Sequence, residues 1–473
     1  MDTISIDFIS IMPIVFLSGL TLAVLILEAF VKKNSELSFW ISLIGVGTNI
    51  GITVISLPLR GLPAGNMITQ GGYGNFFGIL FLSAAFITIV LSREYLKKSH
   101  TDFGEFYLLI LFATLGMMLM ASAADLIIIF LGLELMSICL YVLVGFFRKR
   151  LKSNESSIKY FLLGAFATGF LLYGIALVYG AAHTTNIAAI VGMLPVLSTL
   201  KMFWLGFGLI LVGFAFKIAS VPFHMWVPDV YEGAPTTVTG FMSTGAKAAA
   251  FAAFVLVFSY SHFPASGLRH VFALLAAASM LIGNIVAISQ TNIKRMLAYS
   301  SIAHAGYMLI GLAALNQLGK EGILFYIATY VFMNLGAFGI ISLLEMDEDK
   351  NLNLSDYAGL GTKRPFLAAL MAIFMFSLSG IPPFGGFFGK YYIFVAAVNA
   401  DLTWLAIFGV LMSVIGVYYY LRLVVIMYFQ EGGIESLPTP SFSSLAVITV
   451  AALAIIQLGV FPAFTLSIIQ HLF

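Results

Sequence analysis

Residues 205–251 read LGFGLILVGFAFKIASVPFHMWVPDVYEGAPTTVTGFMSTGAKAAAF, and this stretch decides what kind of fold the chain can adopt. It places Lys217 and Lys247 inside apolar runs, with Pro222 between them. Proline lacks an N–H and clashes with the preceding turn, so this position predicts a broken helix. A lysine at the centre of a bilayer costs about 3 kcal/mol, and irregular backbone at that depth needs protein or water around it. The two features indicate an ion path; the simpler alternative is snorkelling lysines beside a proline kink.

The composition is that of a polytopic membrane protein. Of the 473 residues 61% are hydrophobic and 9% are charged, whereas a soluble domain carries about 25% charged residues. Runs of about 20 apolar residues are long enough to cross a bilayer. Asp2 and Asp7 precede segment 1, and no basic residue does. Segment 1 therefore lacks the positively charged start of a cleaved signal peptide, and we expect it to remain in the mature protein. We predict fourteen spans, near residues 11–30, 38–57, 75–92, 106–122, 125–147, 158–181, 202–231, 235–260, 269–289, 296–315, 321–344, 366–399, 402–429 and 443–468.

The basic residues predict the orientation of these spans, because loops rich in Lys and Arg stay in the cytoplasm. If the N-terminus lies outside, the cytoplasmic loops carry sixteen of the 23 basic residues, among them Lys294, Arg295 and Arg422, and the outer loops carry four. The remaining three are Lys217, Lys247 and Lys390, inside the membrane. Fourteen spans with both termini outside therefore fit the charge asymmetry.

No pattern in the sequence predicts a cofactor or metal site. The single cysteine, Cys139, lies in segment 5 and is expected to be a small buried hydrophobe. The seven histidines show no paired metal spacing, and GGYGNFFG at 71–78, expected in a loop, has the wrong glycine spacing for a dinucleotide. Any redox or nucleotide chemistry must therefore belong to partner chains, and we expect no nucleic-acid partner.

Two further ionisable groups lie inside predicted spans. Glu134 is nine residues into segment 5, roughly 13 Å deep, where a carboxylate needs a partner or a proton. Alternatively, it is a neutral acid hydrogen-bonded within the bundle. His304 has Ser300, Ser301 and Tyr307 within one turn, a polar face typical of a hydrated interior, although hydrogen bonds between helices would explain it equally well.

Three polar positions lie next to the spans. His224 follows the break in segment 7 and is either a proton shuttle or a structural hydrogen-bonding group. Asp229 and Glu232 are expected to be solvated residues of the turn between segments 7 and 8 rather than members of a relay. The mixed-charge stretch 345–365 is expected to be a solvated cytoplasmic connection.

Segment 12 repeats the broken-helix pattern. GIPPF at 380–384 aligns with SVPFH at 220–224, five segments earlier, and an odd offset means that the two copies cross the membrane in opposite senses. The lysines do not superpose, because Ser377 occupies the position equivalent to Lys217 and Lys390 follows the second break. The predicted fold is an all-α bundle of about 14 transmembrane helices with two inverted five-helix repeats and broken helices 7 and 12. Its units are an N-terminal three-helix unit at 1–104, a first repeat (helices 4–8) at 105–261, a second repeat (helices 9–13) at 262–430 and a C-terminal helix 14 at 431–473.

With these residues established, the chain resembles the antiporter-like membrane subunits of bacterial proton-pumping NADH-quinone oxidoreductase (respiratory complex I), relatives of the antiporter subunits of multisubunit cation/proton exchangers. FKIASVPFHMWVPDVYEGAPT at 216–236 and NIKRMLAYSSIAHAGYM at 292–308 carry the resemblance, which covers essentially the whole chain. By resemblance, the proton-translocating residues are Glu134 of helix 5, Lys217 of broken helix 7, Lys247 of helix 8, Lys390 of broken helix 12 and His304 of the linking helix.

Within that family the resemblance is to the N subunits. A lysine at position 390 is similar to subunits N and L, whereas subunit M carries a glutamate there. The chain ends at Phe473, just after segment 14, without the long lateral helix of subunit L, so N is expected.

The resemblance implies a translocase subunit in the bacterial inner membrane. NADH, FMN, iron–sulfur clusters and quinone would be bound in partner subunits, and the partners in the bilayer would be other membrane-arm subunits. Protonated Lys217 would be held by ionised Glu134, and weakening of that pair would release the proton toward Lys247, then through His304 and Lys390 with intervening water. The alternatives are a subunit of a multisubunit cation/proton antiporter and a stand-alone secondary transporter.

Overall fold

The computed structural model describes residues 8–30, 35–57, 63–64, 67–69, 71–258, 265–345, 350–433 and 439–472. Nearly all of this chain is helical, as the composition predicts. In the N-terminal half the elements are α1 (Phe8–Phe30), α2 (Ser35–Ser56), the antiparallel pair β1 (Pro63–Ala64) and β2 (Ile68–Thr69), α3 (Gly72–Lys98), α4 (Glu105–Ala121), α5 (Leu126–Val144), α6 (Leu151–Ala182), α7 (Ile187–Gly192), α8 (Leu194–Leu197), α9 (Lys201–Lys217), α10 (Val227–Gly233), α11 (Thr236–Phe241), a π-helix (Met242–Ala246) and α12 (Lys247–Phe258).

The second half continues in the same manner, with a short 3-10 turn between two long helices. Its elements are α13 (Ala265–Ser289), α14 (Ile293–Ala314), α15 (Gln317–Leu344), the 3-10 turn (Leu354–Tyr357), α16 (Leu360–Lys363), α17 (Pro365–Ser379), α18 (Gly385–Val398), α19 (Thr403–Phe429), α20 (Phe442–Val460) and α21 (Pro462–Gln470).

The helices fit a membrane by length and composition. Among the described residues, eleven helices or continuous helical stretches are long and apolar enough to cross a bilayer, and α4, α17 and α18 are shorter apolar helices. Each of the fourteen predicted segments contains a described helix or a pair of helices. The count of fourteen spans stays a prediction, and so do the unit boundaries, of which 261–262 lies outside the described residues.

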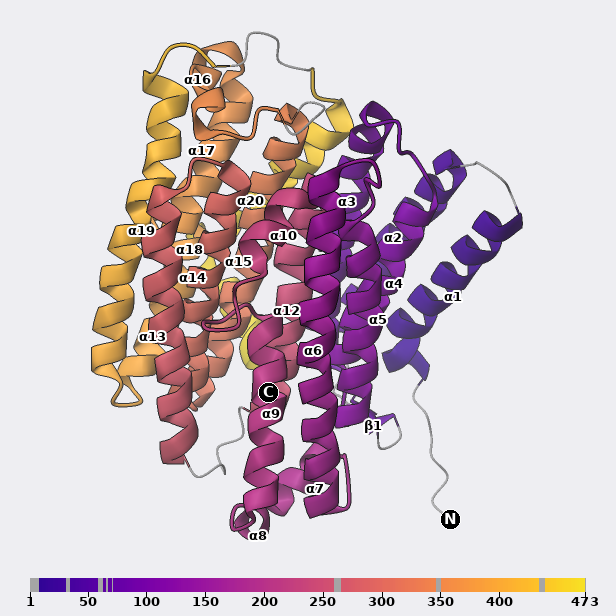
Figure 1. Cartoon of the computed structure of the whole chain (residues 1–473), viewed down its shortest axis with the longest axis vertical. Helices are drawn as coiled ribbons and strands as arrows, with labels where there is room; N and C mark the ends of the chain where they lie inside the picture. The colour runs from indigo at the N-terminus through magenta and orange to yellow at the C-terminus, as the bar shows by residue number, and fades with distance from the viewer. Residues whose placement is uncertain are drawn as a thin grey trace.

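The helices at the centre of the bundle have no apolar stripe, because protein surrounds them on every side. In their most apolar windows α14 and the stretch from α11 to α12 are 94% buried, and α15 is 89% buried, whereas α1 is only 22% buried. Figure 1 shows α13 and α19 on one side of the bundle and α1 on the other, with α12, α14 and α15 between them. Lys247 and His304 belong to these central helices, and Lys390 lies on α18, which packs against α15.

Glycines allow some pairs of helices to pack closely. The Cβ of a residue replacing Gly116 in α4 would lie 2.5 Å from the carbonyl oxygen of Gly132 in α5, and one replacing Gly174 in α6 would lie 2.6 Å from that of Gly206 in α9. Small residues allow such backbones to approach. The second half pairs its helices in the same order, α13 with α14 and α15 with α18. This agreement supports the inverted repeat, which stays a prediction.

Both predicted helix breaks are present. The first helix of segment 7, α9, ends at Lys217, and irregular chain leads to α10. Trp226 packs across this break. Its ring stacks on Tyr160 with centroids 4.5 Å apart, and its Nε1 donates to the carbonyl oxygen of Phe216 at 3.2 Å. In segment 12, α17 ends at Ser379 before Gly380, whose φ of +85° favours glycine. The irregular backbone is only partly buried at both sites, because Pro222, Pro382 and Pro383 are exposed.

Several positions differ from the sequence-based expectation. The glycine cluster at 71–78 begins helix α3 instead of forming a loop. Arg422 and Lys294 were counted as loop residues, but they lie within α19 and α14, and Lys294 is buried, donating to the carbonyl oxygen of Ala234 at 2.7 Å. A helix that continues past the membrane surface gives no local sequence signal of its end. Cys139 is buried in α5, as predicted.

Candidate functional site

Lys217 is the last residue of α9 and is 7% exposed. Its Nζ donates to the hydroxyl oxygen of Ser137 at 2.8 Å and to that of Tyr141 at 3.4 Å, both on α5. The ring of Tyr160 lies 5.7 Å from the same nitrogen, within the range of a cation–π contact. Neither Ser137 nor Tyr141 was singled out from the sequence, although positions 134, 137 and 141 share one face of a helix.

Glu134 does not form the expected ion pair with Lys217. Among the described residues no ion pair joins these two side chains, and Oε1 of Glu134 is buried without a hydrogen-bond partner. The serine one turn further along α5, Ser137, takes the position that the pair hypothesis gave to the acid. Glu134 lies one turn from Ser137 on the same face of α5. The acid is therefore next to the residue that binds the lysine, without direct contact with the lysine itself.

Lys247 begins α12, directly after the π-helix, and is 3% exposed. Its Nζ donates to the carbonyl oxygen of Ser301 at 2.7 Å and also to the Ser301 hydroxyl. That hydroxyl oxygen accepts a hydrogen bond from Tyr330 at 2.9 Å and lies 3.4 Å from the hydroxyl of Tyr231. π-Helices occur mostly as single-turn bulges and frequently at functional sites. Lys247 is thus bonded to neutral oxygens of α14.

His304 lies one turn after Ser301 on α14 and is 1% exposed. Its Nδ1 lies 2.6 Å from the hydroxyl of Tyr326 on α15, and its Nε2 lies 3.0 Å from that of Tyr420 on α19. Tyr420 also bonds the hydroxyl of Ser300. A neutral imidazole donates from one nitrogen and accepts at the other. Both ring nitrogens therefore have partners suited to proton transfer.

Lys390 binds the broken end of α17. Its Nζ donates to the carbonyl oxygens of Ser379 at 2.9 Å and Leu378 at 3.3 Å, and to the hydroxyl of Ser413 on α19 at 2.8 Å. The last carbonyls of a helix lack partners within it, so a break after Ser379 provides acceptors for a buried ammonium. The ring of Tyr307 lies 4.9 Å from Nζ.

Tyrosines on α14, α15 and α19 connect the sites of Lys247, His304 and Lys390. The hydroxyl of Tyr307 accepts from Asn284 at 3.2 Å, and Asn284 accepts from Tyr419 at 3.1 Å. Tyr326 and Tyr330 are one turn apart on α15 and serve His304 and Lys247 respectively. Sequence reasoning did not select these tyrosines, because a tyrosine in an apolar helix is as readily explained by packing.

Three of the six predicted site residues, Lys247, His304 and Lys390, lie in one group, and Glu134, Lys217 and His224 lie outside it. The hydroxyl of Tyr330 bonds that of Ser301 beside Lys247, and the Tyr330 ring lies 5.3 Å from the ring of His304. The ring of Tyr307 lies between His304 and Lys390, 5.8 Å from the His304 ring and 4.9 Å from Nζ of Lys390. Within the described chain, no run of hydrogen bonds leads from Lys217 to Lys247. His224 lies in the irregular stretch after α9, half-buried, and its Nδ1 has no hydrogen-bond partner.

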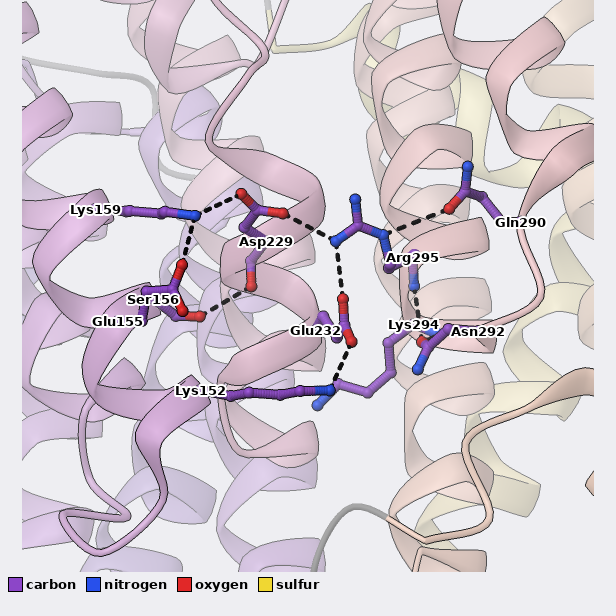
Figure 2. Close-up of polar contacts among 10 residues, drawn as sticks. All are labelled: Lys152, Glu155, Ser156, Lys159, Asp229, Glu232, Gln290, Asn292, Lys294 and Arg295. Carbon is purple, nitrogen blue, oxygen red and sulfur yellow. Dashed lines mark hydrogen bonds and ion pairs between the residues drawn. The ribbon is translucent and has the colours of Figure 1, made fainter.

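Asp229 and Glu232 are not the simple solvated turn residues that we expected. Arg295 of α14 reaches both, with Nη1 2.9 Å from Oδ1 of Asp229 and 2.8 Å from Oε2 of Glu232. From α6, Lys159 lies 3.0 Å from Asp229 and Lys152 lies 2.9 Å from Glu232. Figure 2 shows α10 held between these two helices. This ion cluster joins α6, α10 and α14 at one end of the bundle.

The charges in the cluster fix the ionisation of Glu232. Burial by itself would raise the pKa of its carboxyl group, but hydrogen bonds from Arg295 and Lys152, together with their positive charges, outweigh burial and place the pKa below its usual value of 4.5. Glu232 therefore stays ionised at neutral pH. A permanently ionised carboxylate between two cations is suited to hold α10 in place, which agrees with the expectation that Glu232 is not a relay member.

Metal binding finds no support in the described part of the chain, where no three His, Cys, Asp or Glu side chains gather closely enough to hold an ion.

Comparison with known proteins places this arrangement in a family. The family model described as "NADH:quinone oxidoreductase/Mrp antiporter, TM" matches residues 123–416. The NADH-quinone oxidoreductase subunit N of Trichlorobacter lovleyi is 48% identical, over 98% of this chain and 96% of its own length. A chain of respiratory complex I from Thermus thermophilus superposes with a TM-score of 0.84 and 34% identity, covering 96% of this chain and 98% of that chain.

A chain of the Mrp complex from Dietzia shares the fold, with a TM-score of 0.87 at 20% identity over 98% of this chain and 97% of that chain. The bundle alone does not separate these families, whereas the identity along nearly the full sequence does. The chain therefore belongs to the NADH-quinone oxidoreductase subunit N family.

Proposed function

We propose that the chain conducts protons across the membrane as a membrane-arm subunit of an NADH-quinone oxidoreductase. The observation that supports it most is the group of Lys247, His304 and Lys390, which are deeply buried and bonded to backbone carbonyl oxygens and to hydroxyl groups. The hydroxyl groups can both accept and donate a proton. Carboxylates would be expected if these charges only stabilised the fold, because a buried ammonium is usually paired.

The chemistry follows from the burial of Lys247 and Lys390, neither of which forms an ion pair with an acid in the described part of the chain. A lysine that meets only carbonyl and hydroxyl oxygens gains little from its charge, so a modest change in the surrounding field shifts the equilibrium between ammonium and amine. The ammonium of Lys247 would give its proton to the hydroxyl network around Ser301 and Tyr330. The neutral amine would then be ready to accept the next proton.

His304 is suited to relay the proton onward. A proton arriving at one ring nitrogen can be matched by loss of a proton from the other, which lies against a different tyrosine. Lys390 would receive it with the help of water between Tyr307 and the end of α17. At the other end of the path, Glu134 would control Lys217 through space, and Ser137 would hold the ammonium group in position.

The energy would come from partner subunits, in which we expect NADH, FMN, iron–sulfur clusters and quinone to bind. The chain would lie in the bacterial inner membrane with both termini outside. A cation/proton antiporter subunit is a less supported alternative, because the likeness to the Mrp complex is one of fold. Genes for flavin and iron–sulfur subunits beside this one would favour the oxidoreductase.

The test is proton pumping by the purified complex in liposomes. Lys247→Ala and Lys390→Ala should each lower the number of protons moved per NADH oxidised, while the subunit composition stays unchanged. Lys149→Ala, which removes an exposed lysine, is the matched control. Full pumping by both variants would reject the function proposed for these lysines.

A further inference from the structure

Glu345 is a buried acid that the proton path described above does not use. It follows the last residue of α15 and is 3% exposed, although the sequence placed it in a solvated loop. Its Oε2 accepts hydrogen bonds from the hydroxyls of Tyr95 at 3.0 Å and Thr236 at 2.5 Å. Arg150 lies 3.6 Å from Oε1. The carboxylate is therefore held between α3, the start of α6 and the start of α11.

Glu345 lies at the basic end of the bundle, which we define as the end that carries Lys98, Arg150 and Arg295. Lys98 donates to the backbone carbonyl oxygen of Glu345 at 2.6 Å. Tyr357 is close enough to interact electrostatically with the carboxylate. By the distribution of basic residues this end faces the cytoplasm. The ionisable groups around Glu345 are thus Tyr95, Lys98, Arg150 and Tyr357.

Two buried polar atoms near Glu345 have no hydrogen-bond partner. They are Oε1 of Glu345, which has only the longer contact with Arg150, and the hydroxyl oxygen of Tyr357. A buried polar atom in this condition is normally served by ordered water. These surroundings therefore suit an acid that exchanges protons with water better than they suit an acid that is closed in an ion pair.

Three hydroxyl residues, which we call the hydroxyl row, lie along the helix between the site of Glu345 and Lys247. Thr236 bonds Glu345, and Thr239 and Ser243 donate to backbone carbonyl oxygens. Thr236, Thr239 and Ser243 follow one another at intervals of three and four residues on α11 and the π-helix, and Lys247 comes four residues later. The three hydroxyl residues are completely buried. Eleven residues of helix span roughly 16 Å, which is the separation along the helix between Thr236 and Lys247.

Helix α15 packs against the helix that carries the hydroxyl row. It contacts both α11 and the π-helix, and it carries Asn334 between Tyr330 and Glu345. Oδ1 of Asn334 is buried without a hydrogen-bond partner, while its Nδ2 donates to the carbonyl oxygen of Tyr330 at 3.3 Å. This unpartnered acceptor, one turn from Tyr330 on α15, is a further place for ordered water.

We propose that Glu345 is the proton-accepting group at the basic end and that the hydroxyl row of α11 and the π-helix conducts protons from it to Lys247. The carboxylate takes a proton from the aqueous side and becomes a neutral acid. It then gives the proton to water within the row, and that water protonates the neutral amine of Lys247, while Arg150 offsets the restored negative charge. This inference rests on the proposed function of Lys247.

The experiment measures protons pumped per NADH by the purified complex in liposomes at pH 6, 7 and 8. Glu345→Gln should lower this ratio severalfold, and the loss should be greater at pH 8, where protons are scarce and the collecting group matters most. Glu345→Asp should restore part of it, and Thr236→Val should reduce it to a smaller extent. Glu431→Gln, which changes an exposed acid beyond the end of α19, should have no effect.

Arg150→Gln separates proton uptake from simple ion pairing. It removes the cation and leaves the acid, so it should weaken thermal stability about as much as Glu345→Gln does, yet keep most of the pumping. If Arg150→Gln and Glu345→Gln lose pumping equally at every pH, the acid is a structural partner and the proposal is wrong. Should Glu345→Gln fail to assemble, Glu345→Asp and Thr236→Val still decide, because unchanged pumping in both would overturn the uptake route.

Lys247→Ala in the same preparations tests the function proposed for Lys247 separately from the uptake route through Glu345. Loss of pumping in Lys247→Ala with normal pumping in Glu345→Gln would reject the uptake route alone. Normal pumping in Lys247→Ala would reject the proposed function, whatever Glu345→Gln does.

Discussion

At the scale of single residues, Lys217 is bonded to a serine and a tyrosine where the sequence suggested an acid. Ser137 accepts its hydrogen bond, and Glu134 lies one turn from Ser137 on the same helix. The electrostatic influence of a carboxylate falls gradually with distance, whereas a hydrogen bond is lost abruptly. Glu134 is thus suited to adjust the proton affinity of Lys217, and Ser137 is suited to fix its position.

Glu134 and Lys217 should therefore behave as interacting sites. Lys217→Ala should impair proton pumping strongly, Glu134→Gln should impair it less, and the double variant should be little worse than the worse single one. Lys217→Arg should fail in part, because a guanidinium keeps its proton near neutral pH. The measurement is pumping per NADH across a pH series. Two single losses that multiply in the double variant, or full pumping by Lys217→Arg, would contradict the interaction.

The ion cluster around Glu232 should make the protein sensitive to acid. Its pKa is depressed in the folded state, so its contribution to stability is present above the unfolded pKa of about 4.5 and is lost as pH falls through the folded value. Glu232→Gln should lower the Tm of the detergent-purified protein at pH 7, by a loss of about 1.5–3 kcal/mol, and the difference from wild type should shrink toward pH 4. An undiminished difference at pH 4 would show that the effect is not electrostatic.

At the scale of helices, two structural features position the site: broken helices and close glycine contacts. Broken helices release carbonyl groups that Lys390 binds, and glycines allow the backbones of α6 and α9 to approach closely. The α6–α9 contact fixes the position of α9, whose last residue is Lys217.

Gly174 and Gly169, both on α6, test the second feature. A Cβ at Gly174 would lie 2.6 Å from the carbonyl oxygen of Gly206 and 2.8 Å from the amide nitrogen of Ile210, so Gly174→Ala should force α6 and α9 apart and cost about 1–3 kcal/mol. At Gly169 a Cβ would meet nothing within 4 Å, so Gly169→Ala should be neutral or slightly stabilising. The Tm of the purified protein measures both. Equal effects would mean that helix propensity, and not close approach, decides.

At the scale of the whole molecule, the central helices are surrounded by protein and the outer ones present apolar residues. This arrangement gives the proton path an interior of helices that do not face lipid. It also separates a basic end from an opposite end, on which α7 and α8 lie (Figure 1).

Labelling of single cysteines from one side tests the orientation. In a Cys139→Ala background, Lys149→Cys should be alkylated from the cytoplasmic side and Ser467→Cys from the outer side, since both positions are exposed. Ser153, in the same cytoplasmic loop by sequence, is unsuitable because it is buried and bonded to the carbonyl oxygen of Val144. Labelling of both cysteines from the same side would reject the predicted topology.

The sequence by itself determined the class of the molecule, the two helix breaks and the presence of lysines inside apolar segments. Each of these follows from local chemistry: a run of apolar residues long enough for a bilayer, a proline without an N–H, or a charge inside an apolar run. The family resemblance came from contiguous motifs around the first break and His304. The fourteen spans and the inverted repeat are predictions of the same local kind.

Only the tertiary structure decided what each charge meets. Ser137 is 80 residues from Lys217 in the sequence, Ser301 is 54 from Lys247, and Tyr95 is 250 from Glu345. A hydroxyl group in an apolar helix and an acid after a helix end carry no local sign of such partners. Burial decides which groups they bond, because a polar atom inside the bundle needs a partner on another helix or a water molecule.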